Sequence, residues 1–236
     1  MRSKSALVVA TALCAALLTN PVQGATASVR VNEVSCSGAD WVELHNPTKS
    51  AVDISNWILS DRPDGGTARH QFAIARGTVM QPGAFLVLDE GLASNQLTWG
   101  VNCADGEEVF LFSSLRPAVT KVDSLKVPPG LSGFTYGRLN ASASGRTIST
   151  RGKANLDGRP ALVSATTLRC TVGKSCKHVL KISNGGKAAL AKAVAGVKLS
   201  NGTLTFTARK KQTLKIAVRL TNPAGSKPVT LSISFA

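Results

Sequence analysis

Short segments in which large apolar residues alternate with polar ones recur along the whole chain. The first two clear examples, 41–44 and 57–59, each begin with a tryptophan. The turn-forming run 46–50 separates them, and the dense turn sequence 61–66 follows. Alternation over a few residues between such turns is typical of half-buried β-strands. The stretch 40–61 therefore predicts two strands and a turn, whose tryptophans anchor one face of a sandwich core.

The same patterns predict further strands in the first half of the chain, at 70–74, 85–88, 107–112 and 121–127. From residue 140 to residue 158 the composition changes to Ser, Ala, Gly, Thr and Arg, with little apolar content. We expect a partly ordered closing loop there, which runs into a linker at Gly158-Arg159-Pro160.

The second half repeats the alternation in strand-length segments, at 176–182, 197–200, 203–206, 214–220 and 229–235. Asn201-Gly202 separates two of them, and this dipeptide is the strongest short-range indication of a β-hairpin. The segment 188–195 is compatible with a helix, and the pattern leaves its structure open. About seven short strands in so short a region predict a small immunoglobulin-like sandwich. The expected fold is all-β, with two immunoglobulin-like β-sandwich domains in tandem.

Several motifs of the first half occur together in a fixed order. They are Asn32-Glu33-Val34, the runs 40–47 and 54–61, Pro82-Gly83-Ala84-Phe85-Leu86-Val87-Leu88, Gly106-Glu107-Glu108-Val109-Phe110-Leu111, Tyr136-Gly137-Arg138 and Gly152-Lys153-Ala154-Asn155. As a set, over about 28–157, they resemble the lamin-tail domain family, which includes the tails of nuclear lamins and many secreted or surface bacterial proteins. The resemblance implies an immunoglobulin-like β-sandwich, with no agreed activity and no catalytic residues to carry over to this chain. Arg151 stands where a proline is usual in that family.

The N-terminus has the pattern of a secretory signal peptide. Arg2 and Lys4 precede an apolar run at 6–18, and small residues ending at 25–27 follow it. This arrangement of charged, apolar and small residues is typical of a cleaved signal. A membrane anchor needs about 20 apolar residues, which is more than this run contains. We therefore expect a secreted or cell-surface protein with no transmembrane segment in the mature chain.

Cleavage of residues 1–27 would leave an even number of cysteines, because it removes Cys14. The four that remain are Cys36, Cys103, Cys170 and Cys176. An even number of cysteines in an exported protein predicts disulfides. Their spacing favours Cys36–Cys103 and Cys170–Cys176 over the other two pairings. A zinc site is the competing interpretation, and it is disfavoured because only His178 lies near.

Charge divides the mature chain into two unequal parts. Residues 28–157 contain twelve Lys and Arg and thirteen Asp and Glu, whereas from Arg159 onward there are fourteen Lys and Arg and no acidic residue. Such asymmetry between halves indicates separate modules. We predict a lamin-tail-like sandwich at 28–157, a linker at 158–161 and a basic immunoglobulin-like sandwich at 162–236.

Residues with the potential for catalysis are few and scattered. The three histidines, His45, His70 and His178, lie in no nucleophile or metal motif. Glu33 and Glu43 are candidates for an acid–base pair. The alternative, which we favour, is that both carboxylates hydrogen-bond to neighbouring strands and turns.

Aspartates in glycine-containing loops raise the question of calcium. Asp61, Asp64 and Asp105 lie in such loops, but the EF-hand spacing is absent and Asp and Gly are ordinary turn formers. The sequence therefore predicts no metal, no cofactor and no enzymatic activity.

The basic second module carries the clearest functional indication. Its positive field would attract polyanions, such as extracellular DNA or an anionic polymer of the cell envelope. Binding would depend on the backbone of a nucleic acid rather than its bases, because this half has few aromatic residues for stacking. The alternative is a basic surface that is merely solvated. The candidate binding residues are Lys174, Lys177, Lys181, Lys198, Arg209, Lys210, Lys211, Lys215 and Arg219, with Arg209 to Lys211 expected at a hairpin tip.

These observations favour a secreted, non-enzymatic protein with a scaffold domain and a polyanion tether. The scaffold domain would leave room for a protein partner, and the sequence does not give the oligomeric state. Two other functional classes remain open at this point. One is an accessory of a secreted nuclease or hydrolase that uses Glu33, Glu43 and the loop aspartates, and the other is a purely structural envelope protein.

Overall fold

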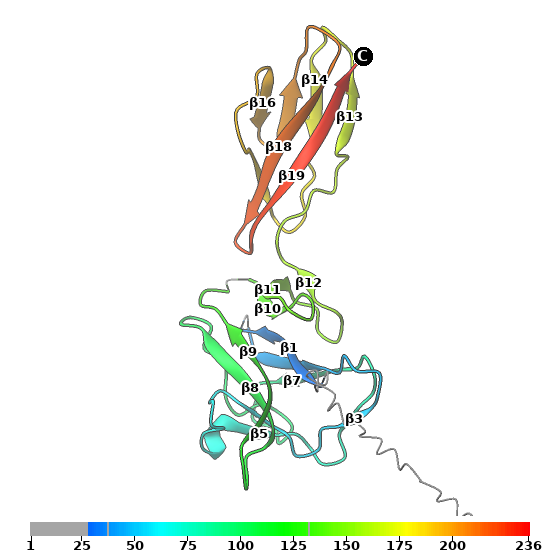
Figure 1. The fold of residues 1–236 in the computed structure, drawn as a ribbon. Helices are drawn as coiled ribbons and strands as arrows, with labels where there is room; N and C mark the ends of the chain where they lie inside the picture. The colour runs from blue at the N-terminus through cyan, green and yellow to red at the C-terminus, as the bar shows by residue number, and fades with distance from the viewer. Residues whose placement is uncertain (1–27, 37, 132) are drawn as a thin grey trace, which may run out of the picture.

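The computed structural model of the protein describes residues 28–36, 38–131 and 133–236. Within these residues the chain is all-β, with strands β1 to β19 and one short 3₁₀ helix, η1 (Ala68–His70). The strands form two bodies that follow each other along the chain (Figure 1). The described part of the chain contains no helix that is long and apolar enough to cross a membrane. The predicted signal peptide, residues 1–27, lies outside the described residues.

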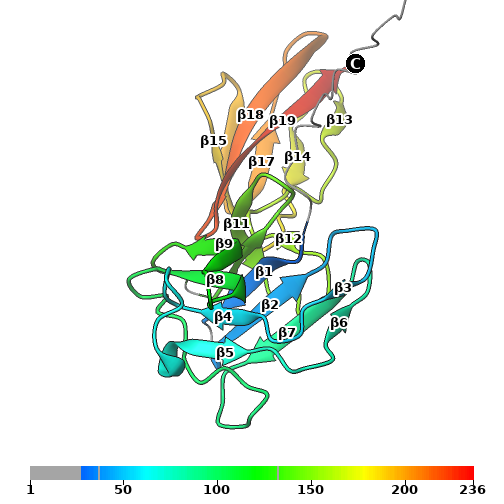
Figure 2. The ribbon, with the colours of Figure 1, turned by 60° about the horizontal axis from the view of Figure 1, so that its bottom comes forward.

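The first sandwich packs a six-stranded antiparallel sheet against a four-stranded one (Figure 2). The larger sheet has the order β12-β11-β10-β1-β2-β7 and the smaller sheet the order β5-β4-β8-β9, with a separate pair, β3-β6. The strands are β1 (Arg30–Ser35), β2 (Trp41–His45), β3 (Val52–Asp53), β4 (Ile58–Ser60), β5 (Gln71–Ala73), β6 (Val79–Met80), β7 (Phe85–Asp89), β8 (Glu107–Ser114), β9 (Thr120–Val127), β10 (Thr135–Arg138), β11 (Ser144–Ile148) and β12 (Leu156–Asp157).

The core of this sandwich comes from the alternating positions of its central strands. Val42 and Leu44 of β2 are fully buried, as are Val109 and Leu111 of β8 in the facing sheet. Trp41 is buried, and Trp57 is partly buried against the core cluster. Burial of so many aliphatic and aromatic groups is the main stabilising contribution to such a fold. The predicted strands at 41–44 and 57–59 are confirmed.

The closing region differs from the prediction. Residues 140–158 were expected to form a partly ordered loop, but β11 and β12 lie within this region and extend the larger sheet. β11 pairs with β10 over four residue pairs, from Thr135↔Thr147 to Arg138↔Ser144. Its sequence, SGRTI, lacks apolar alternation, so the strand depends on backbone pairing with β10 rather than on a buried face.

The second sandwich has a four-stranded and a three-stranded sheet around its own core. The larger sheet has the order β13-β19-β18-β15, in which β13 and β19 are parallel, and the smaller one has the order β14-β17-β16. Leu204 and Phe206 from one sheet meet Ile216, Leu231 and Ile233 from the other, and all five are fully buried. The strands are β13 (Thr167–Cys170), β14 (Cys176–Val179), β15 (Lys187–Leu190), β16 (Val197–Ser200), β17 (Thr203–Phe206), β18 (Gln212–Asn222) and β19 (Gly225–Phe235).

Two local predictions in this half have a clear outcome. Asn201 and Gly202 both have positive φ, 48° and 72°, and they join β16 to β17 as the expected hairpin. This is the left-handed geometry that favours Asn-Gly in two-residue turns. The segment left open between helix and strand, 188–195, contains most of β15, which pairs with β18 at the edge of its sheet. The two-sandwich, all-β fold is as predicted.

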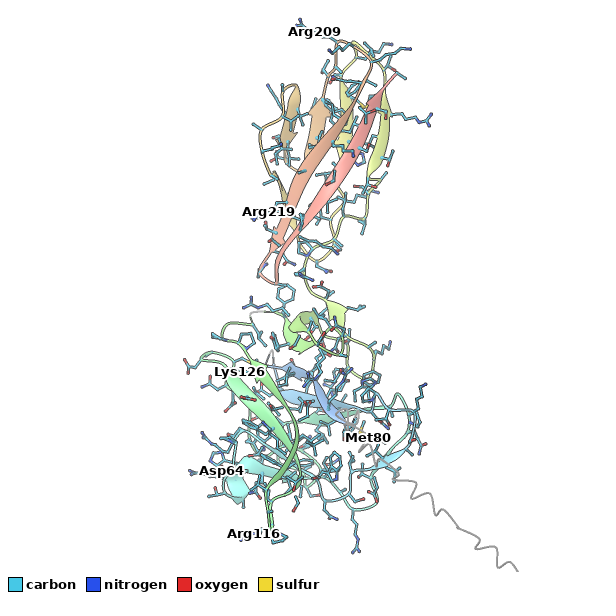
Figure 3. All side chains as sticks on the ribbon, viewed as in Figure 1. Asp64, Met80, Arg116, Lys126, Arg209 and Arg219 are labelled. Atoms are coloured by element: carbon cyan, nitrogen blue, oxygen red, sulfur yellow. A yellow bond between two sulfur atoms is a disulfide. The ribbon has the colours of Figure 1, made fainter. Side chains whose placement is uncertain are left out.

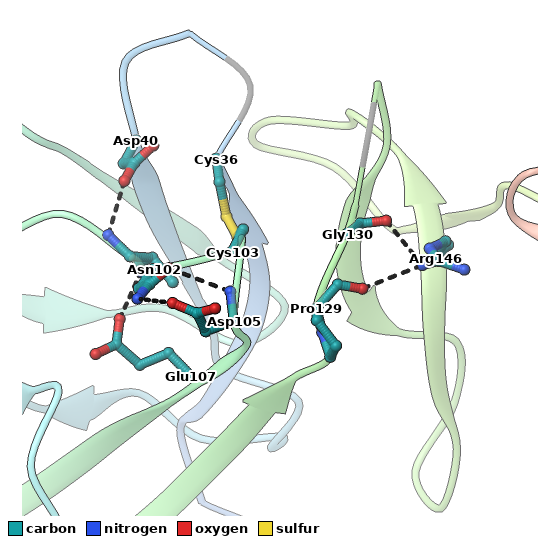
Figure 4. The surroundings of a disulfide bond; sticks show 10 residues. Cys36, Asp40, Asn102, Cys103, Asp105, Glu107, Pro129, Gly130 and Arg146 are labelled. Atoms are coloured by element: carbon teal, nitrogen blue, oxygen red, sulfur yellow. Dashed lines mark hydrogen bonds between the residues drawn. A yellow bond between two sulfur atoms is a disulfide. The ribbon is translucent and has the colours of Figure 1, made fainter.

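Both predicted disulfides are present, Cys36–Cys103 and Cys170–Cys176. The first joins the end of β1 to the loop before β8, and Figure 4 shows its surroundings. In the same region Arg146 donates hydrogen bonds to the carbonyl oxygens of Pro129 and Gly130. The second disulfide closes a short loop between β13 and β14.

The segment between the two sandwiches is hydrogen-bonded to the second sandwich, and a further hydrogen bond joins the two sandwiches directly. Asn222 Nδ2 donates to the carbonyl oxygen of Gly158 at 2.8 Å, and Asn184 Nδ2 donates to that of Arg159 at 3.1 Å. Arg146 Nη1 of the first sandwich donates to the carbonyl oxygen of Pro223, in the β18–β19 turn, at 3.0 Å. This turn therefore faces the first sandwich, and the opposite end of the second sandwich lies away from it (Figure 1).

Candidate functional site

Charged side chains of the second sandwich form no ion pair among the described residues, although the pKa of the Asp157 carboxyl is lowered by its bond to Arg159 and, to a smaller extent, by nearby Lys227 of this sandwich. Residues 160–236 contain thirteen Lys and Arg and no Asp or Glu. Each ion pair found in the described residues lies between Asp61 and Arg159. Among the described residues from 160 onward, no Lys or Arg side chain donates a hydrogen bond. These cations are therefore available to an external anion.

Two of the predicted binding residues, Lys215 and Arg219, lie on the outer face of the four-stranded sheet. On β18 they alternate with Ile216, Val218 and Leu220, which are buried in the core. The register places two further cations on this face, Arg169 of β13 and Lys187 of β15 (both exposed). Neither was among the predicted residues. The alternation in 167–170 was available in the sequence, whereas the strand at Lys187 required the structure.

Two other predicted residues belong to the smaller sheet, and a third lies just beyond it. Lys177 of β14 and Lys198 of β16 are both paired with Thr205 of β17, so all three lie in one row across the sheet. Lys177 and Lys198 are exposed, and Lys181 follows in the same alternating phase just beyond β14. The outer faces of two packed sheets point in opposite directions. These lysines are therefore on the opposite side of the sandwich from Lys215 and Arg219.

The remaining four predicted residues lie at the end of the second sandwich that is remote from the first. Arg209, Lys210 and Lys211 are in the connection from β17 to β18, and Figure 3 shows Arg209 at this far end. Lys174 is in the loop closed by Cys170–Cys176. The two loops contact each other, because Gly173 N donates to Ala208 O at 2.8 Å. We call Lys174 and 209–211 the distal basic end.

The expected hairpin tip at Arg209 to Lys211 is wrong. β17 belongs to the three-stranded sheet and β18 to the four-stranded sheet, so 209–211 crosses between layers. More generally, the nine predicted residues do not converge on one patch. They separate into the distal basic end and two groups on opposite faces, because alternation along each strand says nothing about which sheet the strand joins.

The two carboxylates considered for acid–base chemistry are buried side by side in the first sandwich. Glu33 of β1 and Glu43 of β2 are directly paired across the sheet, and neither has exposed surface. Glu33 accepts hydrogen bonds from the hydroxyl groups of Thr135, Thr147 and Thr150. These donors lie on β10, on β11 and in the segment after it.

Glu43 binds the segment that closes the sandwich. One of its oxygens accepts from Asn32 Nδ2 at 2.7 Å and the other from Gly152 N at 2.5 Å. Burial raises the pKa of Glu43 above its ordinary value of 4.5, and the hydrogen bond from Gly152 opposes this effect. Every carboxylate oxygen of the pair thus accepts from the chain itself, which matches the structural interpretation favoured from the sequence.

Residues of the closing motif complete this buried network. Asn155 Nδ2 donates to the carbonyl oxygens of Asn32 and Arg138 at 2.9 and 3.0 Å. Gly137 faces this side chain, and a Cβ added to Gly137 would lie 2.8 Å from the oxygen of Asn32. No side chain fits there without displacing the network. The motifs Tyr136-Gly137-Arg138 and Gly152-Lys153-Ala154-Asn155 are therefore parts of one contact.

Arg151, which replaces the usual proline, makes contacts of its own. Its Nη2 donates to both carboxylate oxygens of Asp89 at 2.7 and 2.8 Å. Its guanidinium group also lies 5.3 Å from the ring centroid of Trp41, within the range of a cation–π interaction. The closing segment is thus held to β2 and β7 by a side chain that proline lacks.

The other candidates for chemistry lie apart from one another. Asp61 accepts from His70, whereas Asp64 and Asp105 bond to neighbours in their own turns. His45 stacks on Phe85, and burial lowers the pKa of its imidazole, as does nearby Arg30. In the part of the chain that the structure describes, no three metal-ligating side chains gather.

Comparison with protein families agrees with this arrangement of motifs. Residues 23–128 match the family model of the Lamin Tail Domain. The chain contains a lamin tail domain. The match ends before β10, so the closing strands of this domain and the whole second sandwich lie outside it. No curated protein sequence matches the chain.

Solved structures with some likeness include tandem immunoglobulin domains. The N-terminal immunoglobulin module of a Drosophila receptor protein tyrosine phosphatase is 13% identical, with 88% of this chain and 92% of that chain covered and a TM-score of 0.28. A tandem of titin immunoglobulin domains is 8% identical, with 89% and 95% covered and a TM-score of 0.28.

A putative α-galactosidase from Bacteroides fragilis is 18% identical, with 34% of this chain covered and a TM-score of 0.31. The aligned part spans 18% of the galactosidase chain. At these identities and scores the likenesses carry no argument about function.

Proposed function

We propose that this protein is a secreted, non-enzymatic binding protein whose basic second sandwich tethers it to a polyanion. The polyanion is DNA or an anionic polymer of the cell envelope, and the lamin tail domain serves as the scaffold that meets other partners. The observation that carries the proposal is the set of thirteen cations in 160–236, none of which is paired with an acid.

Unpaired cations at one end of an elongated protein favour encounter with an anionic surface. The distal basic end combines four of them in two loops that contact each other. The charges of each face add to the same field, since no Asp or Glu side chain in the second sandwich opposes them. Such a field raises the rate of association with polyanions and weakens as salt screens it.

The lamin tail domain supports the scaffold half of the proposal through the way it uses its charges. Glu33 and Glu43 bind the closing segment, and Arg138 Nη2 donates to both carboxylate oxygens of Asp123 at 2.7 and 2.8 Å. These groups hold strands together and are not presented to a substrate. A rigid sandwich with its polar residues engaged internally suits presentation of loops to a protein partner.

The test is fluorescence anisotropy with labelled duplex DNA and labelled poly(glycerol phosphate), each titrated with the full chain over a salt series. If six phosphates are contacted, the logarithm of the affinity for duplex DNA should fall against the logarithm of salt with a slope of roughly −5. The variant Arg209→Gln/Lys210→Gln/Lys211→Gln should make this slope shallower by roughly 3.

The matched control removes three exposed cations from the lamin tail domain, through Lys49→Gln/Arg76→Gln/Arg116→Gln. It lowers the net charge equally and should leave the slope close to that of the unmodified protein. Absence of binding by the unmodified protein at about 50 mM salt would refute the tether. Hydrolysis of either polymer that disappears in Glu43→Gln would refute the non-enzymatic assignment.

A further inference from the structure

The outer face of the β13-β19-β18-β15 sheet combines cations with hydroxyl groups and carries no acid. The strand register places these residues in rows that run across the sheet, since directly paired residues project to the same side. One row joins Arg169, Ser234 and Thr213, and the next joins Thr167, Ser232 and Lys215. Ser and Thr hydroxyls donate to anionic oxygens without adding charge of their own.

The cations of this face form a diagonal line. Arg169 lies on one edge strand, Lys215 and Arg219 lie on β18, and Lys187 lies on the other edge strand, paired with Thr221. All four are exposed. Because a strand advances about 3.4 Å per residue, the rows of Arg169 and Lys187 are about 27 Å apart along β18. This length suits several repeats of an extended polymer rather than one small anion.

Hydroxyl groups occupy most of the positions between these cations. Thr213 and Ser234 lie within hydrogen-bond distance of each other, with their oxygens 3.3 Å apart. The remaining outward positions hold small residues or proline, and no aromatic side chain lies on the face. The outward hydroxyl residues are Thr167, Thr213, Thr221, Ser226, Thr230, Ser232 and Ser234.

The opposite face is a poorer surface for such a ligand. It has three short strands, and Lys177 and Lys198 lie side by side in one row across the strands instead of being spread along the length of the sheet. Val179, two residues beyond Lys177 on the same strand, is 59% exposed. A long anionic chain on this side would lie over fewer cations and over exposed apolar surface.

We propose that the outer face of the β13-β19-β18-β15 sheet holds a linear phosphodiester polymer without bases, such as a polyol phosphate, along the line from Arg169 to Lys187. The inference rests on the proposed function and assigns it a surface and a ligand class. Phosphate oxygens pair with the four cations, and the hydroxyls donate to the oxygens between them.

Charge complementarity admits any polyanion, and the other properties of the face select among them. Single-stranded nucleic acids bind through bases stacked on aromatic side chains, and this face has none. A helix or a two-stranded ribbon can enter a groove of duplex DNA and contact its bases, whereas the surface of a four-stranded sheet can contact only the phosphate backbone. A chain of phosphates joined by flexible polyols requires neither feature.

The experiment compares two triple variants of the full chain for binding of labelled poly(glycerol phosphate). The first, Arg169→Gln/Lys215→Gln/Arg219→Gln, removes three cations from the proposed face. The second, Lys177→Gln/Lys181→Gln/Lys198→Gln, removes three from the opposite face, so both lose the same net charge. At about 50 mM salt we expect the first variant to lose at least ten times more affinity than the second, and its salt slope to become shallower by roughly 2.

Equal losses in the two variants would overturn the assignment of the face while leaving the proposed tether intact. If the unmodified protein bound neither duplex DNA nor poly(glycerol phosphate), the proposed function itself would instead be overturned. The ligand class would be overturned if duplex DNA, or an oligothymidine of matched length, bound more tightly than poly(glycerol phosphate). Circular dichroism of each variant checks that its sandwich is folded.

A further double variant separates the contribution of hydrogen bonding from the contribution of charge. Ser232→Ala/Ser234→Ala keeps every cation and removes two donors from the rows of Lys215 and Arg169. We expect affinity to fall about threefold to tenfold with an unchanged salt slope. Unchanged affinity would mean that the hydroxyls are not ligands, and the face would then lose its advantage over the other basic surfaces.

Discussion

The lamin tail domain and the second sandwich share an architecture and use charge in opposite ways. In the first, Glu33, Glu43, Asp123 and Arg138 are engaged in bonds that join strands and the closing segment. In the second, the core is apolar and the cations lie outside it without partners. Charges that bond within a fold contribute to its stability, whereas unpaired surface charges remain free to bind ligands.

The two disulfides offer the largest expected effect in this comparison. Cys36–Cys103 spans 67 residues and Cys170–Cys176 spans 6. In the chain-entropy estimate, the longer loop contributes about 4 kcal/mol and the shorter about 2 kcal/mol. We expect Cys36→Ala/Cys103→Ala to lower the free energy of unfolding by about twice as much as Cys170→Ala/Cys176→Ala.

Denaturant unfolding measures both disulfide variants. All three tryptophans, at 41, 57 and 99, belong to the lamin tail domain, so their fluorescence reports on this domain, and circular dichroism reports on both. A larger loss for the short loop would contradict the entropic account and point to strong contacts of the 170–176 loop.

Removal of one internal cation should cost more stability than removal of one external cation. Arg138 donates to Asp123, to Val31 O and to Ser124 O, and it is mostly buried. Arg138→Met should lower the free energy of unfolding by about 3 kcal/mol, because Asp123 loses the arginine with which it forms an ion pair. Arg219→Met in the second sandwich should change it by less than about 0.5 kcal/mol. Similar losses in urea unfolding would remove the distinction between the two regions.

Glu43→Gln tests the buried carboxylates through pH. An amide has one acceptor oxygen, so either Asn32 or Gly152 loses its partner, and we expect destabilisation of about 1–3 kcal/mol near and below pH 4.5. Burial raises the pKa of Glu43 in the folded state, so the folded protein binds the proton more tightly than the unfolded chain does. The free energy of unfolding of the unmodified protein therefore falls as pH rises from 4.5 through the raised pKa.

The difference in the free energy of unfolding between Glu43→Gln and the unmodified protein should consequently narrow as pH increases. Thermal unfolding followed by tryptophan fluorescence between pH 4 and pH 8 measures it, with the exposed Glu90→Gln as the control. A difference that widens with pH would show that the hydrogen bonds to Glu43 outweigh its burial.

The smallest effect concerns Arg151. Its pair with Asp89 is about half exposed, so solvent screens it, and the contact with Trp41 adds a modest amount. We expect Arg151→Ala to cost about 1 kcal/mol or less. Arg151→Pro, which restores the residue usual in the family, should cost no more than Arg151→Ala if the bond of Gly152 to Glu43 survives. Urea unfolding of both variants decides this point.

Much of the fold was predictable because its determinants are local. Alternation placed the strands of the core, Asn201-Gly202 placed a hairpin, and cysteine spacing favoured the correct disulfide pairs. The ordered motifs identified the lamin tail domain. β11 and β12, which lie in the expected loop, and β15, in the segment left open between helix and strand, are edge or near-edge strands with weak patterns. Their structure comes from pairing with neighbouring strands, β10 for β11, β11 for β12 and β18 for β15.

The sequence alone determined how many cations the second half carries, that no acid accompanies them, and which of them alternate with core residues. Only the tertiary structure decided which cations share a surface. It separated Lys177 and Lys198 from Lys215 and Arg219, and it brought Arg169 and Lys187 onto the face of the latter pair. The physical reason is that side-chain direction along a strand is a local property, whereas the sheet that a strand joins depends on pairing between segments far apart in the chain.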